Sequence, residues 1–328
     1  LTLFAELRAL LWALRLHRRG PARLPSSPPR LLIAGSHPVQ YHTPLFQALA
    51  VDKDIDTEVL YLTLPGEDTQ GLGFGVSFTW DLPLLDGYPW REAGSGRGRG
   101  ITSGYTGVWL RHPLRELGFG PSSTRPDALL LTGWHFLGLV QIFLAAWFQR
   151  IPVLLRMDSN GFRPRSIPLT IVYWLLFRGV GIGLTVGTAN ARLYRRNGIP
   201  PHRLITCTHY VDNDFFRQQS ENLRLRRLEL RHKCKINAEA FFFLLAGKLQ
   251  EKKRPLDLLT ALRQLLVHHS DSSHAPIHLL MVGSGHLEPD CRQMVREHHL
   301  PVSFTGFMNQ TEIPEAYAIT DCLVLPSD

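Results

Sequence analysis

Two lysines follow an apolar stretch near the start of the last third of the chain. The loop Gly247-Lys248-Leu249-Gln250-Glu251-Lys252-Lys253-Arg254 leads into a predicted helix whose first residue is Pro255, a position that favours proline. Ligands of doubly wound sheets bind beyond the carboxyl ends of strands, and helix N-termini favour phosphate. The pattern therefore places Lys248 and Lys253 to hold a diphosphate, and a solvated run of surface charge is the alternative.

A pair of glycines follows the next predicted strand. Gly283-Ser284-Gly285 comes directly after the apolar stretch 277–282, and glycine lets the backbone approach a ligand closely. The third glycine of a dinucleotide-binding fingerprint is absent, so an ordinary tight turn explains the pattern equally well.

The elements that position these groups alternate between strands and helices. After a Pro/Ser-rich linker, the sequence predicts strands over 31–34, 57–62, 128–131, 153–155 and 182–186, and helices over 44–50, 136–148, 169–177 and 189–197. This alternation indicates a mostly parallel sheet. We expect the apolar helix 169–177 to be buried, and the glycine-rich stretch 91–107 to be a mobile loop.

A polar helix over 218–233 separates this unit from a second one of the same kind. The second unit is predicted to have strands over 240–246, 277–282, 302–305 and 322–325, the last of them buried, with helices over 255–268, 288–298 and 312–319. The expected organisation is an amphipathic helix and linker over 1–29, one domain over 30–212 and another over 213–328. Both domains are α/β and doubly wound, facing a cleft.

Composition limits the classes of partner. The chain has 328 residues, 44% apolar and 20% charged, with a formal net charge of +8, which suits two globular domains and a polyanionic substrate, an anionic membrane surface or nucleic acid. Nucleic acid is the least favoured partner because the basic residues are not interleaved with a stacking platform or a recognition helix. The four cysteines form no Cys-x-x-Cys pair and are interpreted as reduced thiols in the cytoplasm.

The first residues predict an amphipathic helix with a basic end, over about residues 3–14. It is too short and too charged to span a bilayer, so it either lies on an anionic membrane surface or packs against its own domain. Because the chain begins at Leu1 and the last predicted strand stops at Asp328, we expect it to be a fragment.

The order of motifs in the second unit resembles the donor domain of the group 1, family 4-like, retaining GT-B glycosyltransferases. The resemblance rests on Ala246–Leu249 with Lys253, on Met281–Gly285, on Val302–Phe307 and on Asp321–Asp328. It implies that Lys248 and Lys253 hold the donor diphosphate, that Gly247, Gly283 and Gly285 lie near it, and that the backbone at Phe307 touches the nucleotide base. The family usually has Arg at the position of Lys248, and it continues beyond the end of this chain into a Glu-x7-Glu element for the donor sugar.

The first unit resembles the acceptor half of the same family. Residues 36–45, which include His37, Gln40 and Tyr41, look like the first strand-to-helix loop, and residues 80–88 are similar to a Trp-Asp-x-Pro-Leu-Leu-x-Gly-Tyr stretch of a bacterial subgroup. Arg156 and Asp158 fall where the family lines its cleft. His135 is a candidate to contact the reacting sugar or to be a structural residue, and Asp81 either handles an acceptor hydroxyl or caps a turn.

The resemblance implies sugar transfer with retention from a nucleoside-diphosphate donor to a hydroxyl of a lipid-linked sugar, a polysaccharide or a small molecule. Cell-envelope polysaccharide synthesis on the cytoplasmic side of a bacterial membrane, with peripheral contact to that membrane, would agree with the charge. No cofactor and no metal are expected, because no carboxylate cluster has metal-ligand spacing. The alternatives are a non-catalytic nucleotide-binding or membrane-surface-binding protein, and a nucleotide-sugar epimerase or hydrolase of the same architecture.

Overall fold

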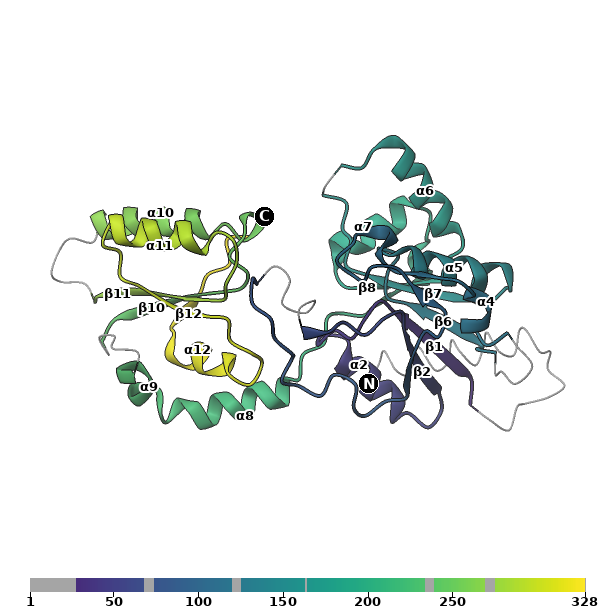
Figure 1. Ribbon diagram of the computed structural model, residues 1–328, viewed down its shortest axis with the longest axis horizontal. Coiled ribbons are helices and arrows are strands. Elements are labelled where there is room, and N and C mark those ends of the chain that lie inside the picture. The colour runs from purple at the N-terminus through teal and green to yellow at the C-terminus, as the bar shows by residue number, and fades with distance from the viewer. Residues whose placement is uncertain are drawn as a thin grey trace. The chain divides into compact units, whose positions relative to one another are not determined.

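The chain forms two compact α/β units (Figure 1). The computed structural model describes residues 28–67, 74–119, 125–162, 164–233, 239–268 and 275–327; the predicted first helix lies outside these residues. Unit 1 runs up to Pro65 and from Leu84 to Val211, and unit 2 comprises Gly66–Pro83 and Asp212–Asp328. The division differs from the expected one at residues 66–83, because the described part of this segment packs on unit 2.

Unit 1 is built on a seven-stranded parallel sheet, as the alternation of elements predicted. The strand order is β3-β2-β1-β6-β7-β8-β9. It reverses direction between β1 and β6, where ligands of open α/β sheets bind. The strands are β1 (Arg30–Gly35), β2 (Asp56–Tyr61), β3 (Trp90–Glu92), β6 (Ala128–Leu131), β7 (Val153–Met157), β8 (Ile182–Thr185) and β9 (Leu204–Thr206).

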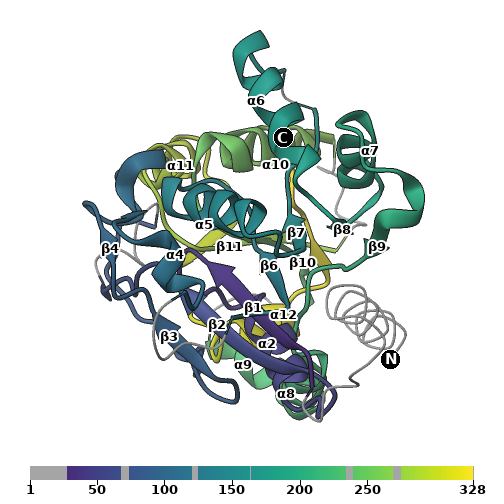
Figure 2. The same ribbon diagram turned by 90° about the vertical axis from the view of Figure 1, so that its right-hand side faces the viewer.

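Helices cover both faces of this sheet because its strands are apolar on both sides (Figure 2). In β1, Leu31 and Ile33 pack against α2 (Thr43–Ala50), whereas Leu32 and Ala34 face the opposite cluster. That second cluster is completed by residues of α5 (Leu137–Phe148), α6 (Ile167–Arg178) and α7 (Thr188–Arg196). The short helix α4 (Pro113–Glu116) lies beside α5.

Unit 2 repeats the design around a four-stranded parallel sheet in the order β12-β11-β10-β13. Figure 1 shows α10 and α11 on one face and α8, α9 and α12 on the other. The strands are β10 (Phe241–Ala246), β11 (Ile277–Val282), β12 (Val302–Gly306) and β13 (Cys322–Leu323), and the helices are α8 (Asn213–Arg224), α9 (Arg227–Lys233), α10 (Pro255–His268), α11 (Glu288–Glu297) and α12 (Ile313–Ile319). The strand order reverses between β10 and β13, although all four strands are parallel.

Two segments predicted to be buried are exposed. In α6 only Phe177 is buried, because the helix extends away from the sheet (Figure 1). Strand β13 lies at the edge of its sheet, and no described element covers its outer side, so Leu323 and Leu325 remain about half exposed.

Other differences are local. The polar helix predicted over 218–233 is two helices, α8 and α9, and α8 begins earlier because the Asp212 carboxylate accepts a hydrogen bond from the backbone N–H of Phe215. The stretch 91–107 contains β4 (Gly96–Arg97), which pairs with β5 (Trp109–Leu110), and the 3-10 turn η1 (Tyr105–Gly107). None of the helices in the described part of the chain combines the length and apolarity needed to cross a membrane.

Candidate substrate-binding sites

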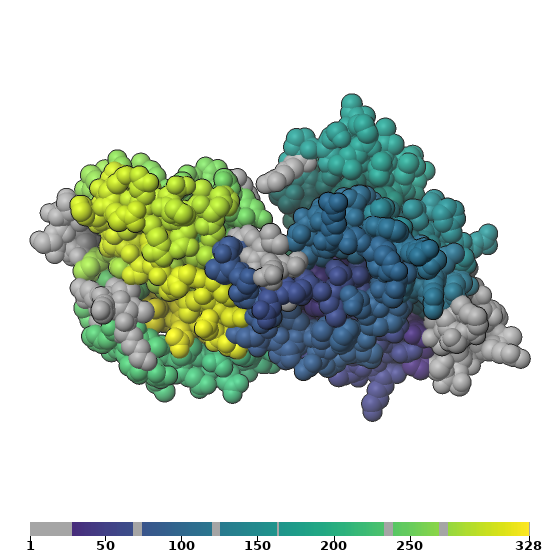
Figure 3. Space-filling view, viewed as in Figure 1, coloured from purple at the N-terminus to yellow at the C-terminus, as the bar shows by residue number. Residues whose placement is uncertain are grey.

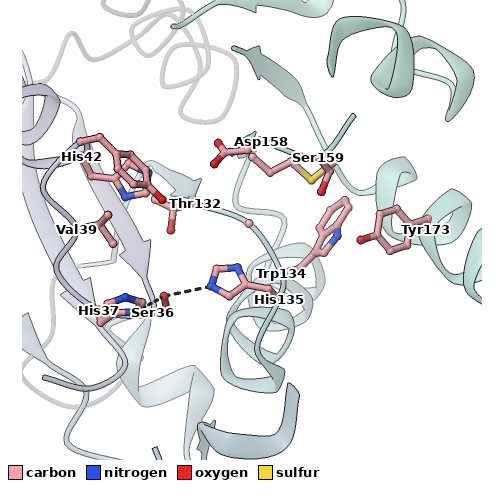
Figure 4. Close-up of a pocket in the computed structure, with 13 residues that line it drawn as sticks. Ser36, His37, Val39, His42, Thr132, Trp134, His135, Asp158, Ser159 and Tyr173 are labelled. Atoms are coloured by element: carbon pink, nitrogen blue, oxygen red, sulfur yellow. Dashed lines mark hydrogen bonds between the residues drawn. The ribbon is translucent and has the colours of Figure 1, made fainter. Parts of the chain in front are cut away.

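Unit 1 has a pocket of about 290 Å³ at the carboxyl ends of β1, β6 and β7. Ser36 and His37 follow β1, Gly133 and His135 follow β6, and Asp158 follows β7. The pocket is therefore lined by residues at the point where the strand order reverses, between β1 and β6. Tyr173 of α6 closes one side (Figure 4). The pocket lies where the strand order predicts a ligand.

A buried serine joins two histidines in this pocket. The hydroxyl of Ser36 lies 2.9 Å from Nδ1 of His37 and 3.2 Å from Nε2 of His135 (Figure 4). Burial, with a smaller effect of His135, lowers the pKa of His37 to about 4. Burial also lowers the pKa of His135, although the nearby Asp158 carboxylate opposes this shift. Both imidazoles are therefore neutral near pH 7, and each retains one donor and one acceptor nitrogen.

Further polar groups lie at or beside the pocket, and His42 is among the residues that line it. Arg156 is 2% exposed, and its guanidinium donates a 3.0 Å hydrogen bond to the carbonyl of Thr208. Its charge contributes to the low pKa of His42, which burial lowers most, to about 3. His209 contacts Arg156 and lies 3.5 Å from the carboxylate of Asp158.

The structure brings together most of the residues predicted for the acceptor side. His37, Tyr41, His135 and Asp158 line the pocket. Gln40 lies in the same loop as His37 and Tyr41 but does not line the pocket, and Arg156 is buried and does not line it either.

Sequence reasoning missed Tyr173 and His209 as parts of this region. Tyr173 comes from a helix that was expected to be buried, and His209 follows β9 (Leu204–Thr206), a strand that was not predicted. A signal for His209 existed in Thr208-His209-Tyr210, because polar residues directly after a parallel strand lie at the ligand-binding edge.

In unit 2 the predicted diphosphate loop lies at the sheet's own reversal point. The loop from Gly247 to Lys253 leaves β10, and the Lys253 ammonium lies 3.4 Å from the hydroxyl of Ser327, which follows β13. Burial, together with the neighbouring Lys252, lowers the pKa of Lys248. Both lysines are at the carboxyl end of the sheet, as the sequence predicted.

The glycines of the turn after β11 allow two loops to pack backbone against backbone. A Cβ on Gly283, which has φ +118°, would lie 2.1 Å from the carbonyl oxygen of Gly247, and a Cβ on Gly285 would lie 2.4 Å from that of Leu249. The Leu249 N–H in turn donates a 2.9 Å hydrogen bond to the carbonyl of Ser284. The close packing of these two loops therefore accounts for both glycines.

Asp81 and the aromatic residues before it pack on unit 2. The ring of Phe78 stacks on Phe307 with centroids 4.0 Å apart, and Phe74 packs edge-on against Phe307 at 4.9 Å. The carboxylate of Asp81 accepts hydrogen bonds from the backbone N–H groups of Gln310 (3.1 Å) and Thr311 (3.0 Å). Asp81 thus belongs with unit 2 rather than with unit 1, to which the sequence assigned it.

A pocket of unit 2 joins this segment to the glycine turn, and Glu288, which also lines it, pairs with Arg292 at 2.7 Å. Phe74 lies on one side, and Ser284, His286, Arg292 and Arg296 lie on the other, at the start of α11 and along it. The Ser284 hydroxyl donates a hydrogen bond of 2.5 Å to the carbonyl of Phe74. The two arginines were missed because they lie within a helix, four and eight residues after Glu288, where α11 begins.

Most of unit 2 is similar to a known family of enzymes. Residues 226–328 match the family model described as Glycosyl transferases group 1. Unit 2 carries a group 1 glycosyltransferase domain. No curated protein matches the chain as a sequence.

Solved structures share the fold of about nine-tenths of the chain. A glycosyltransferase from Rickettsia africae has a TM-score of 0.61 at 13% identity, covering 92% of this chain and 73% of its own. HepE of Anabaena in complex with UDP and glucose has a TM-score of 0.60 at 14% identity, covering 91% and 74%. A UDP-N-acetylglucosamine 2-epimerase has a TM-score of 0.52 at 11% identity, covering 90% and 74%. These likenesses confirm the predicted GT-B type of fold.

The group 1 domain contains the loop of Lys248 and Lys253, the glycine turn and Phe307. The prediction of a glycosyltransferase enzyme is therefore confirmed at the level of this domain. Among the described residues, no group of three or more His, Cys, Asp and Glu side chains could hold a metal ion.

Proposed function

We propose that the chain transfers a sugar from a nucleoside-diphosphate donor to a hydroxyl acceptor, with retention at the anomeric carbon. The observation that carries the proposal is the position of Lys248 and Lys253. Both lie on the loop at the reversal point of the unit 2 sheet, within the residues that match the group 1 family. Retention is inferred from the resemblance of the motifs to the retaining group.

Unit 2 would bind the donor. The HepE structure of the same fold holds UDP and glucose, which supports a nucleotide-sugar donor. Negative charge grows on the leaving diphosphate as the glycosidic bond breaks, so fixed cations at that position lower the barrier without exchanging a proton. Lys248 and Lys253 supply this charge in the proposal, and no metal ion or other cofactor is invoked.

Unit 1 would bind the acceptor in the pocket of Ser36, His37 and His135. Neutral imidazoles offer both a donor and an acceptor nitrogen, which suits the hydroxyl groups of a sugar. The acceptor we propose is a lipid-linked sugar, a polysaccharide or a small molecule, in cell-envelope synthesis on the cytoplasmic side of a bacterial membrane.

The first test measures diphosphate binding to the full chain by isothermal titration calorimetry, with UDP, GDP and ADP as probes. Lys248→Gln and Lys253→Gln remove one charge-assisted hydrogen bond each, so we expect each to weaken binding of the preferred diphosphate by about 10- to 100-fold. Lys53→Gln, an exposed lysine of unit 1, is the matched control. Unchanged binding in both loop variants would contradict the proposal.

Product analysis then separates transfer from the alternatives. The chain is incubated with UDP-, GDP- and ADP-sugars, with and without acceptor sugars, and the products are followed by mass spectrometry and NMR. Transfer requires an acceptor and yields a glycoside with the anomeric configuration of the donor. Release of free sugar or a change of configuration at another carbon, without acceptor, would indicate the hydrolase or epimerase alternative.

A further inference from the structure

Helix α6 presents a large apolar surface that no described element covers. Ile167 is 79% exposed and Phe162, just before the helix, is 74% exposed. Four more large apolar side chains are between 44% and 54% exposed: Leu169, Ile171, Val172 and Leu175. Figure 3 shows the teal surface of this part of unit 1 standing out from its neighbours. Exposed apolar area of this kind marks an interaction surface.

The C-terminal half of α6 packs against the core of unit 1. Tyr173 and Phe177 pack edge-on against the buried Trp134, with ring centroids 5.5 and 5.0 Å apart. Tyr173 and Phe177 therefore hold this part of α6 against the core of unit 1.

The stretch of sequence that contains α6 carries side-chain charge of one sign. No Asp or Glu occurs between Asp158 and Asp212, whereas seven arginines do. Since the whole chain carries +8, this stretch holds almost all of the net charge. The seven are Arg163, Arg165, Arg178, Arg192, Arg195, Arg196 and Arg203.

Several of these arginines border the apolar surface. Arg178 lies over the ring of Trp174 at 3.5 Å, and Arg165 lies over Tyr173 at 4.5 Å. The neighbouring helix α7 adds three exposed arginines (Arg192, Arg195 and Arg196), and the guanidinium of Arg196 lies close to Gly161 in the loop that precedes α6. Trp and Tyr side chains are typical of the membrane–water interface, where their amphipathic rings lie at the level of the headgroups.

We propose that α6 and the arginines beside it form a membrane-docking surface, with α6 inserted into the headgroup region of a bilayer that contains anionic phospholipids. The apolar side chains occupy most sides of the helix, which suits a fluid apolar medium better than the groove of one protein partner. A helix of 12 residues is about 18 Å long, so it inserts without spanning. A second copy of the chain is a poor occupant, since two such faces would bring arginines together.

Docking has a consequence for the unit 1 pocket. Tyr173 contributes both to α6 and to the wall of that pocket, so the pocket lies next to the inserted helix. That the pocket binds the acceptor rests on the proposed function. If it does, the acceptor is a lipid-linked saccharide carried by the same bilayer.

The test is flotation of the full chain with vesicles, without donor or acceptor, so its outcome is independent of catalysis. Vesicles of phosphatidylcholine with roughly 30 mol% phosphatidylglycerol are compared with pure phosphatidylcholine. We expect binding to the anionic vesicles, weakened by salt. The triple variant Ile167→Gln, Ile171→Gln, Leu175→Gln should bind the anionic vesicles at least about tenfold more weakly than the wild type. The triple variant Arg192→Gln, Arg195→Gln, Arg196→Gln should show a loss of the same size.

The matched control is Leu225→Gln, Leu228→Gln, Val267→Gln, which removes three exposed apolar side chains of unit 2. Ile167→Gln alone repeats the test at a position too exposed to affect folding, and circular dichroism checks each variant. Wild-type flotation of the α6 variants would overturn the proposal. Complete loss of flotation on removing residues 1–19 would also overturn it, as would a wild-type dimer that the α6 variant converts to a monomer.

Discussion

Asp81 accepts a 3.0 Å hydrogen bond from the backbone N–H of Thr311, a residue 230 positions later in the chain. The same carboxylate bonds the N–H of Gln310, and the side-chain amide of Asn309 donates a 2.7 Å hydrogen bond back to the carbonyl of Thr79. These bonds satisfy backbone donors just before α12 and hold the segment that contains Phe74 and Phe78 on unit 2. Asp81 is thus engaged as an anchor.

Replacing Asp81 tests this anchoring role. Asp81→Ala leaves two backbone donors without their acceptor, so we expect the free energy of unfolding to fall by about 1–2 kcal/mol. Limited proteolysis within residues 66–83 should become faster. Asp86→Ala is the control, because the backbone carbonyl of Asp86, which accepts a hydrogen bond from the Gln47 side chain, is kept in the variant. If Asp81 were instead the general base that deprotonates the acceptor hydroxyl, Asp81→Asn would abolish turnover and leave the protease resistance of residues 66–83 intact.

The close packing of two loops in unit 2 makes Gly283 sensitive to substitution. Gly283→Ala would place a methyl group 2.1 Å from the carbonyl oxygen of Gly247, at a φ of +118° that disfavours a side chain. We expect a loss of about 2–4 kcal/mol in the free energy of unfolding, measured by urea denaturation. Gly94→Ala, where a Cβ would meet nothing within 4 Å, should remain within about 0.5 kcal/mol of the wild type. Equal stability of the two variants would exclude the loop clash.

The repeated strand–helix pattern made the two sheets predictable. The strands predicted over 128–131 and 277–282 have the observed bounds of β6 and β11, and the helix 255–268 those of α10, because buried parallel strands are continuous apolar runs between turn residues. The loop of Lys248 and Lys253 could be found because it follows such a run.

Exposure and long-range docking could not be predicted in the same way. Helix α6 has the composition of a core helix, and nothing local distinguishes an apolar helix that is covered from one that extends beyond the sheet. The assignment of residues 66–83 to unit 2 depends on contacts of Phe78 with Phe307 and of Asp81 with Thr311. Such contacts across more than two hundred residues leave no periodic signal in either stretch.

His135 is predicted to affect the acceptor side alone. His135→Ala removes a hydrogen-bond partner of Ser36 and a polar group of the unit 1 pocket, so we expect kcat/KM for the acceptor to fall by about 10- to 100-fold. The affinity for the diphosphate should not change. His202→Gln, in the 3-10 turn η2 (Pro201–Arg203), is the control. A parallel loss of diphosphate binding would place His135 in the donor site instead.

The buried histidines of unit 1 predict a loss of stability in weak acid. Their pKa values are about 4 for His37 and about 3 for His42 in the folded chain, because burial disfavours the imidazolium, and about 6.5 in the unfolded chain. Between these values the unfolded state binds more protons, so the free energy of unfolding falls as the pH decreases from about 6.5. At pH 5 each histidine should contribute about 2 kcal/mol to this loss.

Urea denaturation at pH 7.5 and pH 5, with His42→Gln and the exposed His112→Gln as a control, isolates this term from the titration of carboxylates. The His42 variant should lose about 2 kcal/mol less than the wild type between the two pH values, whereas the His112 variant should follow the wild type. An identical pH dependence of all three proteins would show that His42 is protonated as readily in the folded chain as in the unfolded chain, and that Arg156 and the surrounding pocket do not disfavour its charge.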